Sequence, residues 1–226
     1  MAKKAKAKKE VKIIKTVALV TMGCDKNTVD SERIIGGLVA NGFKMTDDHS
    51  EADAVIINTC GFIKAAKEES VNAIVEAGEL KQDGKMQKLI ITGCLTQRYG
   101  KELKKQIKFV DHFFGTNSEQ KILNALTTGN KTHLIGEREL LTPPHYAFLK
   151  ISEGCTHSCS FCSIPKIRGK HISRLEEEIL AEVAMLRDRG VKELNIIAQD
   201  TTFYGKDFDG KSLLADLLGK ISDEFI

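Results

Sequence analysis

The chain has 226 residues, of which 42% are apolar and 29% are charged, and its formal net charge is +3. This length is enough for a substantial hydrophobic core, which argues against a small secreted scaffold stapled by disulfides. No apolar run approaches the roughly 20 residues of a membrane-spanning helix, and no signal peptide is evident. We therefore expect a cytoplasmic protein with no membrane partner and with six reduced cysteines.

The positive charge is concentrated at the N-terminus. Residues 1–15 contain seven lysines and one glutamate, so the remainder of the chain has a net charge of about −3. The segment has few apolar side chains on which to fold, and we predict a disordered basic tail. Such a tail is most often only solubilising, and a weak contact with RNA is the alternative.

Three cysteines occupy equivalent positions in the first half of the chain. Each follows a short apolar run, which is typical of a strand buried in a parallel sheet. Each precedes a segment with the period of an amphipathic helix. The three residues are Cys24, Cys60 and Cys94.

Repeated strand–cysteine–helix units predict a doubly wound α/β domain over residues 16–141. Ligands of such folds bind at the carboxyl ends of the strands, so we expect the three cysteines to face one crevice. Buried cysteines are usually plain small apolar side chains, which is the simpler alternative. Their common position favours a metal cluster with three thiolate ligands and one open site.

Two adjacent prolines, Pro143 and Pro144, mark the best candidate for a linker, at residues 142–145. Residues 146–226 then predict strand, helix, strand and helix, with a cysteine-rich loop after the first strand. That is the position of catalytic loops in a βα barrel. Two βα units cannot close a barrel, so we expect a truncated chain that ends inside this second domain.

The loop contains Cys155, Cys159 and Cys162 in the spacing Cys-x-x-x-Cys-x-x-Cys. Three thiolates can hold three irons of a cubic iron–sulfur cluster and leave the fourth iron open. Structural zinc sites normally fill all four positions, so an open corner indicates a place to bind a small molecule. A zinc knuckle is the alternative.

At this loop the chain resembles radical S-adenosylmethionine (SAM) enzymes. With the three earlier cysteines it resembles the methylthiotransferases of that superfamily, over about residues 15–210. It is most similar to the RimO branch, which modifies an aspartate of ribosomal protein S-twelve. The segments that carry this likeness include Gly23-Cys-Asp-Lys-Asn27, Asn58-Thr-Cys-Gly-Phe-Ile63 and Ala198-Gln-Asp-Thr-Thr202. Asp25 and Leu175 stand where that branch commonly has proline.

The resemblance implies SAM and two [4Fe–4S] clusters as cofactors, one on each set of three cysteines. It implies a reaction in which Cys155, Cys159 and Cys162 are catalytic and a methylthio group reaches the β-carbon of the aspartate. It also implies that Phe161 and Gln199 contact SAM, although Phe161 is equally expected as a core residue. Arg168 and Lys170 receive no role, because both are equally well explained as solvated loop charges.

The implied partners are ribosomal protein S-twelve or the small ribosomal subunit, an electron donor and a sulfur source. A rival within the enzyme class is methylthiolation of an adenosine in transfer RNA, as in the MiaB-like branch. A non-catalytic metal-binding fragment and a disulfide-linked structural protein are rivals from other classes. The small C-terminal nucleic-acid-binding module that the family leads us to expect is absent from this sequence.

Overall fold

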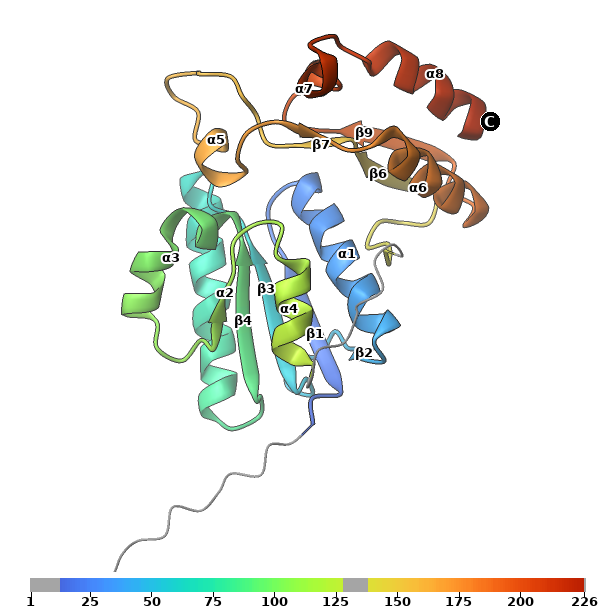
Figure 1. The fold of residues 1–226 in the computed structure, drawn as a ribbon. Helices are drawn as coiled ribbons and strands as arrows, with labels where there is room; N and C mark the ends of the chain where they lie inside the picture. The colour runs from blue at the N-terminus through green and yellow to red at the C-terminus, as the bar shows by residue number, and fades with distance from the viewer. Residues whose placement is uncertain (1–12, 128–137, 226) are drawn as a thin grey trace, which may run out of the picture.

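A computed structural model describes residues 13–127 and 138–225 of the chain. Its first region is built on a five-stranded sheet in the order β2-β1-β3-β4-β5, and all neighbouring strands are parallel (Figure 1). The strands are β1 (Thr16–Thr21), β2 (Lys44–Met45), β3 (Ala54–Thr59), β4 (Lys88–Gly93) and β5 (His112–Phe113). The predicted doubly wound α/β class is confirmed.

Two helices cover each face of this sheet. The helices are α1 (Asp25–Ala40), α2 (Lys64–Gln82), α3 (Cys94–Gln106) and α4 (Glu119–Leu126). Ile74 of α2 and Leu103 of α3 pack on one face, whereas Leu38 of α1 and Ile122 of α4 pack on the other. Every residue of the central strand β3 is buried, as the unbroken apolar run predicted.

The second region contains the parallel pair β6 (Tyr146–Lys150) and β9 (Glu193–Ile197). Helix α6 (Glu176–Asp188) connects these strands, and α8 (Leu214–Phe225) packs against it around a core that includes Leu149, Val183 and Leu217. The shorter elements are β7 (Ser152–Glu153), α5 (Ile164–Ile167), β8 (Ile172–Ser173), a 3₁₀ turn (Thr201–Phe203) and α7 (Lys206–Asp209). The predicted order of two strands and two helices is therefore present.

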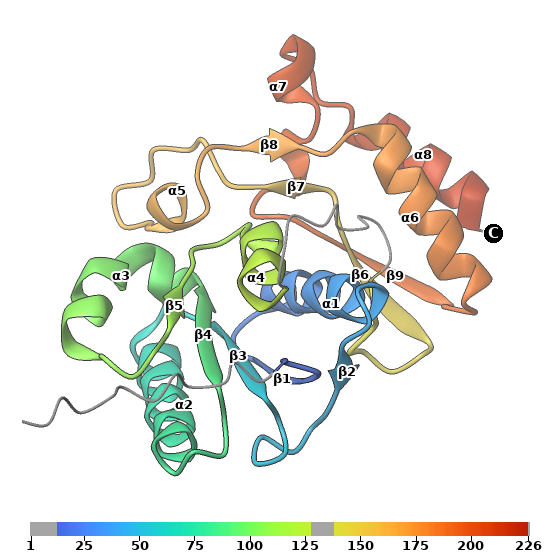
Figure 2. The same ribbon diagram turned by 60° about the horizontal axis from the view of Figure 1, so that its bottom comes forward.

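The second region lies across the carboxyl edge of the five-stranded sheet, with α5 above α3 (Figures 1 and 2). This placement sets α5 and Arg168 opposite the cysteines that follow β1, β3 and β4. Contacts between α1 and β6 join the two regions directly. No helix in the described ranges has the length and apolar character needed to cross a bilayer.

Residues 1–12 of the predicted disordered tail lie outside the described residues. Lys15 departs from the prediction, because its backbone N–H donates to Asp53 Oδ2 at 2.9 Å. The ordered chain therefore begins before the predicted boundary at residue 16, because this hydrogen bond fixes Lys15 next to the start of β1. The two-residue strand β2 was not predicted from the sequence, since two residues show no period.

Candidate metal and cofactor centre

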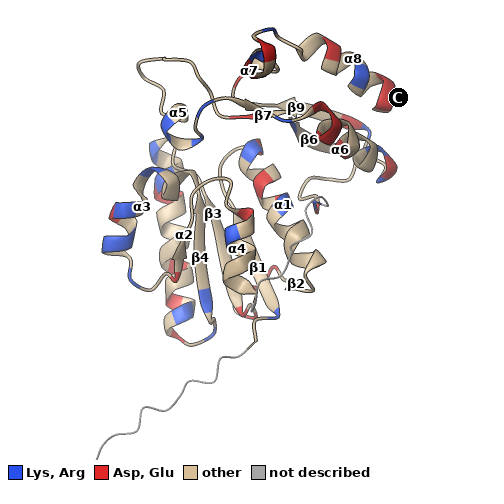
Figure 3. Ribbon diagram, in the orientation of Figure 1, with Lys and Arg blue, Asp and Glu red and all other residues tan. Residues whose placement is uncertain are grey.

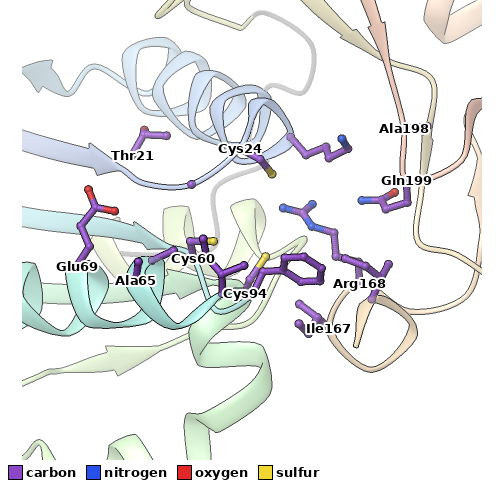
Figure 4. Close-up of a pocket in the computed structure, with 16 residues that line it drawn as sticks. Thr21, Cys24, Cys60, Ala65, Glu69, Cys94, Ile167, Arg168, Ala198 and Gln199 are labelled. Atoms are coloured by element: carbon purple, nitrogen blue, oxygen red, sulfur yellow. The ribbon is translucent and has the colours of Figure 1, made fainter. Parts of the chain in front are cut away.

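The first three cysteines meet at one cavity of about 970 Å³ (Figure 4). Cys24 directly precedes α1, Cys60 follows β3 by one residue, and Cys94 begins α3 directly after β4. All three belong to the cavity lining, as the strand-end rule predicted. The opposite wall comes from the second region, through Ile164, Ile167, Arg168, Ala198 and Gln199.

Two glycines allow the cysteine loops to approach one another. Gly23 has a φ of +98°, and a Cβ added there would lie 3.0 Å from Cys60 Sγ. Gly93 has a φ of +95°, and its Cβ would lie 2.5 Å from Asn58 Oδ1. Both backbone conformations and both distances require glycine, so the shape of the cavity is set by the fold itself.

Burial raises the pKa of the Cys94 thiol to about 11, and the nearby Arg168 only partly opposes that shift. The Cys94 Sγ lies 3.7 Å from Asn27 Oδ1, to which the protonated thiol donates a weak hydrogen bond. Cysteine binds metals as a thiolate. Metal binding at this cavity therefore has to displace a proton from Cys94.

Arg168 lies buried between the two regions, and the prediction of a solvated loop charge is wrong for it. Its Nη1 lies 3.0 Å from Asp30 Oδ2 and 3.0 Å from Glu153 Oε2, and its Nη2 donates to Asn27 Oδ1. Only 2% of the side chain is exposed. Lys170, by contrast, is exposed as expected.

Lys150 completes this buried cluster of charges. It donates to Asp30 Oδ1 and, at 2.8 Å, to Glu153 Oε2, while Gln199 Nε2 donates to Glu153 Oε1 at 2.8 Å. Burial alone would raise the pKa of Asp30, but Lys150 and Arg168 outweigh burial and hold that pKa below its ordinary value. The two cations and two carboxylates thus neutralise one another. We call Asp30, Lys150, Glu153 and Arg168 the interface charge cluster.

The interface charge cluster adjoins both cysteine sets. Asn27, three residues after Cys24, accepts from Arg168, and Glu153 is two residues before Cys155. Sequence reasoning missed the cluster, although one signal was present. Lys150 ends a strand whose other residues are largely apolar, and a charge at such a buried position needs a partner.

The second cysteine set lies on the loop between β7 and α5. Cys155 and Cys162 are partly exposed and Cys159 is exposed. The loop is anchored at its start, where the N–H of Cys155 donates to Gly169 O at 3.1 Å. Gly154 makes that approach possible, because a Cβ there would lie 2.1 Å from Lys170 O. Beyond this anchor, Cys162 N donates to Cys159 O at 3.1 Å.

The two residues expected to contact SAM differ in their surroundings. Phe161 is 90% exposed, so its alternative assignment as a core residue is wrong. Gln199 lines the same cavity as the first cysteine set and is held by Glu153. The adjacent Asp200 pairs with His157 of the cysteine loop, at 2.6 Å between Oδ2 and Nε2.

The described cysteines do not form a site for a single metal ion. No three His, Cys, Asp or Glu side chains in the described ranges converge on a point that one metal ion would occupy. Thiolates around one zinc ion lie within about 4 Å of each other, because each Zn–S bond is about 2.3 Å. Thiolates of a cubic cluster bind separate irons and therefore lie farther apart than thiolates that share one ion. All six cysteines are free of disulfides.

Comparison with known families agrees with this division of the chain. The Uncharacterized protein family UPF0004 matches residues 16–115, which carry the first cysteine set. The Radical SAM superfamily matches residues 149–223, which carry the second. The match of residues 149–223 to that superfamily implies SAM and a [4Fe–4S] cluster as cofactors.

Curated relatives indicate which kind of radical SAM protein this chain resembles. The chain is 50% identical over 205 residues to "Ribosomal protein uS12 methylthiotransferase RimO" of Chloroherpeton thalassium, covering 91% of this chain and 47% of the relative. The protein of the same name from Chlorobium limicola is 50% identical over 207 residues, covering 92% and 48%. The chain is thus similar to radical SAM methylthiotransferases over about nine-tenths of its own length, and it spans about half the length of these relatives.

Solved structures show the same fold at low sequence identity. The radical SAM methyltransferase TsrM from Kitasatospora setae, with cobalamin and a [4Fe–4S] cluster bound, superposes with a TM-score of 0.58 at 11% identity. That match covers 92% of this chain and 52% of the other. The cobalamin-dependent SAM radical enzyme OxsB gives a TM-score of 0.56 at 10% identity, over 93% of this chain and 37% of the other.

Proposed function

We propose that this protein acts as a methylthiotransferase that modifies the β-carbon of an aspartate in ribosomal protein uS12. Identity of about 50% to relatives of that name, over nine-tenths of the chain, carries the proposal. The two cysteine sets on either side of the interface charge cluster support it, because the reaction needs two kinds of chemistry close together. The substrate would place the protein in the cytoplasm.

We assign Cys24, Cys60 and Cys94 to one [4Fe–4S] cluster and Cys155, Cys159 and Cys162 to a second. When bound, these groups supply one-electron cleavage of SAM and the sulfur that is transferred. An electron donor and a sulfur source are needed as partners. The wide cavity and its cysteine lining support the first assignment, and the Cys-x-x-x-Cys-x-x-Cys spacing supports the second.

Three side chains of this protein would bind SAM or fix the positions of the two regions around it. Gln199, at the end of β9, is fixed by Glu153 and faces the cavity from the second region, which suits a contact with SAM (Figure 4). Phe161 stands out from the cysteine loop, where its ring is available to cover an adenine. Arg168 would hold the two regions at a fixed separation.

We also propose domains at residues 16–141 and 146–226, joined by residues 142–145. The pairing of β1 to β5 in one sheet, and of β6 with β9 in another, supports this division. The interface charge cluster and the cavity between the regions indicate that they work as one unit. For the basic tail at residues 1–15, we retain a weak RNA contact as the alternative to a purely solubilising role.

The test compares methylthio transfer by the reconstituted protein to two substrates, the small ribosomal subunit and transfer RNA. With SAM, a sulfide source and a reductant, we expect small ribosomal subunits to gain a methylthio group on one uS12 aspartate, detected by peptide mass spectrometry. The Cys155→Ala variant should lose SAM cleavage, since its open-iron cluster would lack a ligand. Methylthiolation of transfer RNA instead would contradict the assigned substrate, and retained SAM cleavage in Cys155→Ala would contradict the catalytic role.

A further inference from the structure

A basic surface on α3 lies apart from the cysteine cavity. Lys101, Lys104 and Lys105 on the helix, and Lys108 just after it, are all exposed, and α3 carries a single acidic residue, Glu102. Figure 3 shows this helix as a cluster of basic residues. None of the four lysines forms an ion pair with a carboxylate in the described ranges. Within the described residues, these four lysines are therefore available to pair with an anionic partner.

A hollow of about 410 Å³ adjoins the basic end of α3. Its lining combines two of these lysines with aromatic side chains. The residues are Lys104, Ile107, Lys108, Val110, Asp111, His112, Phe113 and Phe114. Within it, the rings of His112 and Phe114 are stacked, with centroids 5.6 Å apart and planes 5° from parallel. The volume is within the range of small-molecule sites.

The one carboxylate in the hollow does not cancel its positive character. Asp111 pairs with Lys81 and accepts the N–H of Leu89 at 2.7 Å, so its charge is already engaged. Burial lowers the pKa of His112, and the neighbouring Lys88 and Lys81 lower it further, opposed only by Asp111. The imidazole is therefore neutral at neutral pH and adds an aromatic face without repelling the lysines.

We propose that the surface formed by Lys101, Lys104, Lys105, Lys108 and the His112–Phe114 pair binds single-stranded RNA. Lysines follow the phosphates and the aromatic pair receives a base, which is the combination used by single-strand binding proteins. An acidic protein segment would use the lysines but has no need of a stacked ring pair in a hollow of nucleotide size. The chemistry thus favours nucleic acid over an acidic polypeptide.

The position of this surface separates it from the reaction site. Cys94 begins α3 and Lys108 follows its end, and the helix is kinked between them at Tyr99. The hollow and the cysteine cavity share no lining residue, so RNA bound at the hollow would not occupy the cavity. Only the identity of the RNA as ribosomal rests on the proposed function; binding itself can be measured without any transfer reaction.

The experiment is a fluorescence-anisotropy titration of a labelled single-stranded RNA with the full chain, between about 50 and 200 mM salt. Replacing Lys101, Lys104, Lys105 and Lys108 by Gln should reduce the slope of log K against log salt by about 2 to 3, because each phosphate contact contributes about 0.7. A matched control replaces four exposed lysines from other parts of the surface: Lys44, Lys85, Lys192 and Lys211. The control should leave the slope unchanged.

The aromatic pair is tested separately. His112→Ala should weaken RNA binding about tenfold with an unchanged salt slope, and His112→Phe should restore it, since stacking needs only a ring. An equal loss of slope in both lysine variants would overturn the proposal, as would no loss in either. Displacement of RNA by poly-glutamate at equal charge concentration would also overturn it, and would indicate an acidic protein partner.

Discussion

The two cysteine sets differ in how the protein holds them. Cys60 and Cys94 are 8% and 7% exposed at the ends of buried parallel strands, and the exposed Cys24 directly precedes α1. The second set lies entirely on one loop, where Cys159 is exposed. The first set is positioned by the sheet, because each cysteine directly follows or closely follows one of its parallel strands. The second depends on a loop anchored at Gly154 and Gly169, so its final geometry depends on what it binds. One chain thus combines a preformed site with a site completed by its cofactor.

The largest expected loss of stability comes from Arg168→Ala, which removes the side chain that joins the two regions. Asp30 and Glu153 would lose a buried cation, and breaking such a pair costs about 3–5 kcal/mol of unfolding free energy. Urea denaturation measures this loss. Lys170→Ala is the matched control, because that side chain is exposed and should change stability by less than about 0.5 kcal/mol. Equal stability of the two variants would contradict a structural role for the cluster.

A smaller effect with a characteristic pH dependence is expected for Asp30→Asn, since Glu153 still pairs with both cations. The pKa of Asp30 is lowered on folding, so its ionisation stabilises the protein at pH values above its unfolded pKa of about 3.9. That contribution is lost as the pH falls through the lower folded pKa. The stability difference between wild type and Asp30→Asn should therefore shrink in acid. A difference that stays constant from pH 7 to pH 2 would contradict the assignment.

Gly23→Ala should damage the preformed site alone. The added methyl group would lie 2.8 Å from Cys60 Cβ at a positive φ, and such strain costs about 1–3 kcal/mol. We expect less iron at the first cysteine set and unchanged iron at the second, measured by elemental analysis of the reconstituted protein. Gly42→Ala is a matched control, because its φ is +84° but nothing lies within 4 Å. Iron loss in both variants would show that strain, and not the contact with Cys60, is responsible.

The smallest change in stability is expected for His157→Ala, a substitution in the loop that carries the second cysteine set. Its side chain is 50% exposed, and the pair with Asp200 is worth less than about 1 kcal/mol at such a position. The thermal midpoint of the metal-free chain should hardly change. A loss comparable to that of Arg168→Ala would mean that the second site is preformed like the first, and the contrast between the two sites would fail.

Sequence patterns predicted the elements that are long or repeated. The run ending at Cys60, the helical period after it and the strand-end rule together located three distant cysteines at one cavity. They did not locate Arg168, because its burial depends on Asp30, 138 residues away in sequence and brought near only by the folding of both regions. Short elements such as β7 and α5 escaped for a related reason, since tertiary contacts rather than periodicity define them.

The most direct test of the account counts iron and acid-labile sulfide after anaerobic reconstitution. We predict about eight irons per chain in the wild type, and about four in the triple alanine variant of either cysteine set, because each cubic cluster holds four. The Cys24/Cys60/Cys94 and Cys155/Cys159/Cys162 variants serve as controls for each other. About four irons in the wild type, or zinc in place of iron, would contradict two clusters on two cysteine sets.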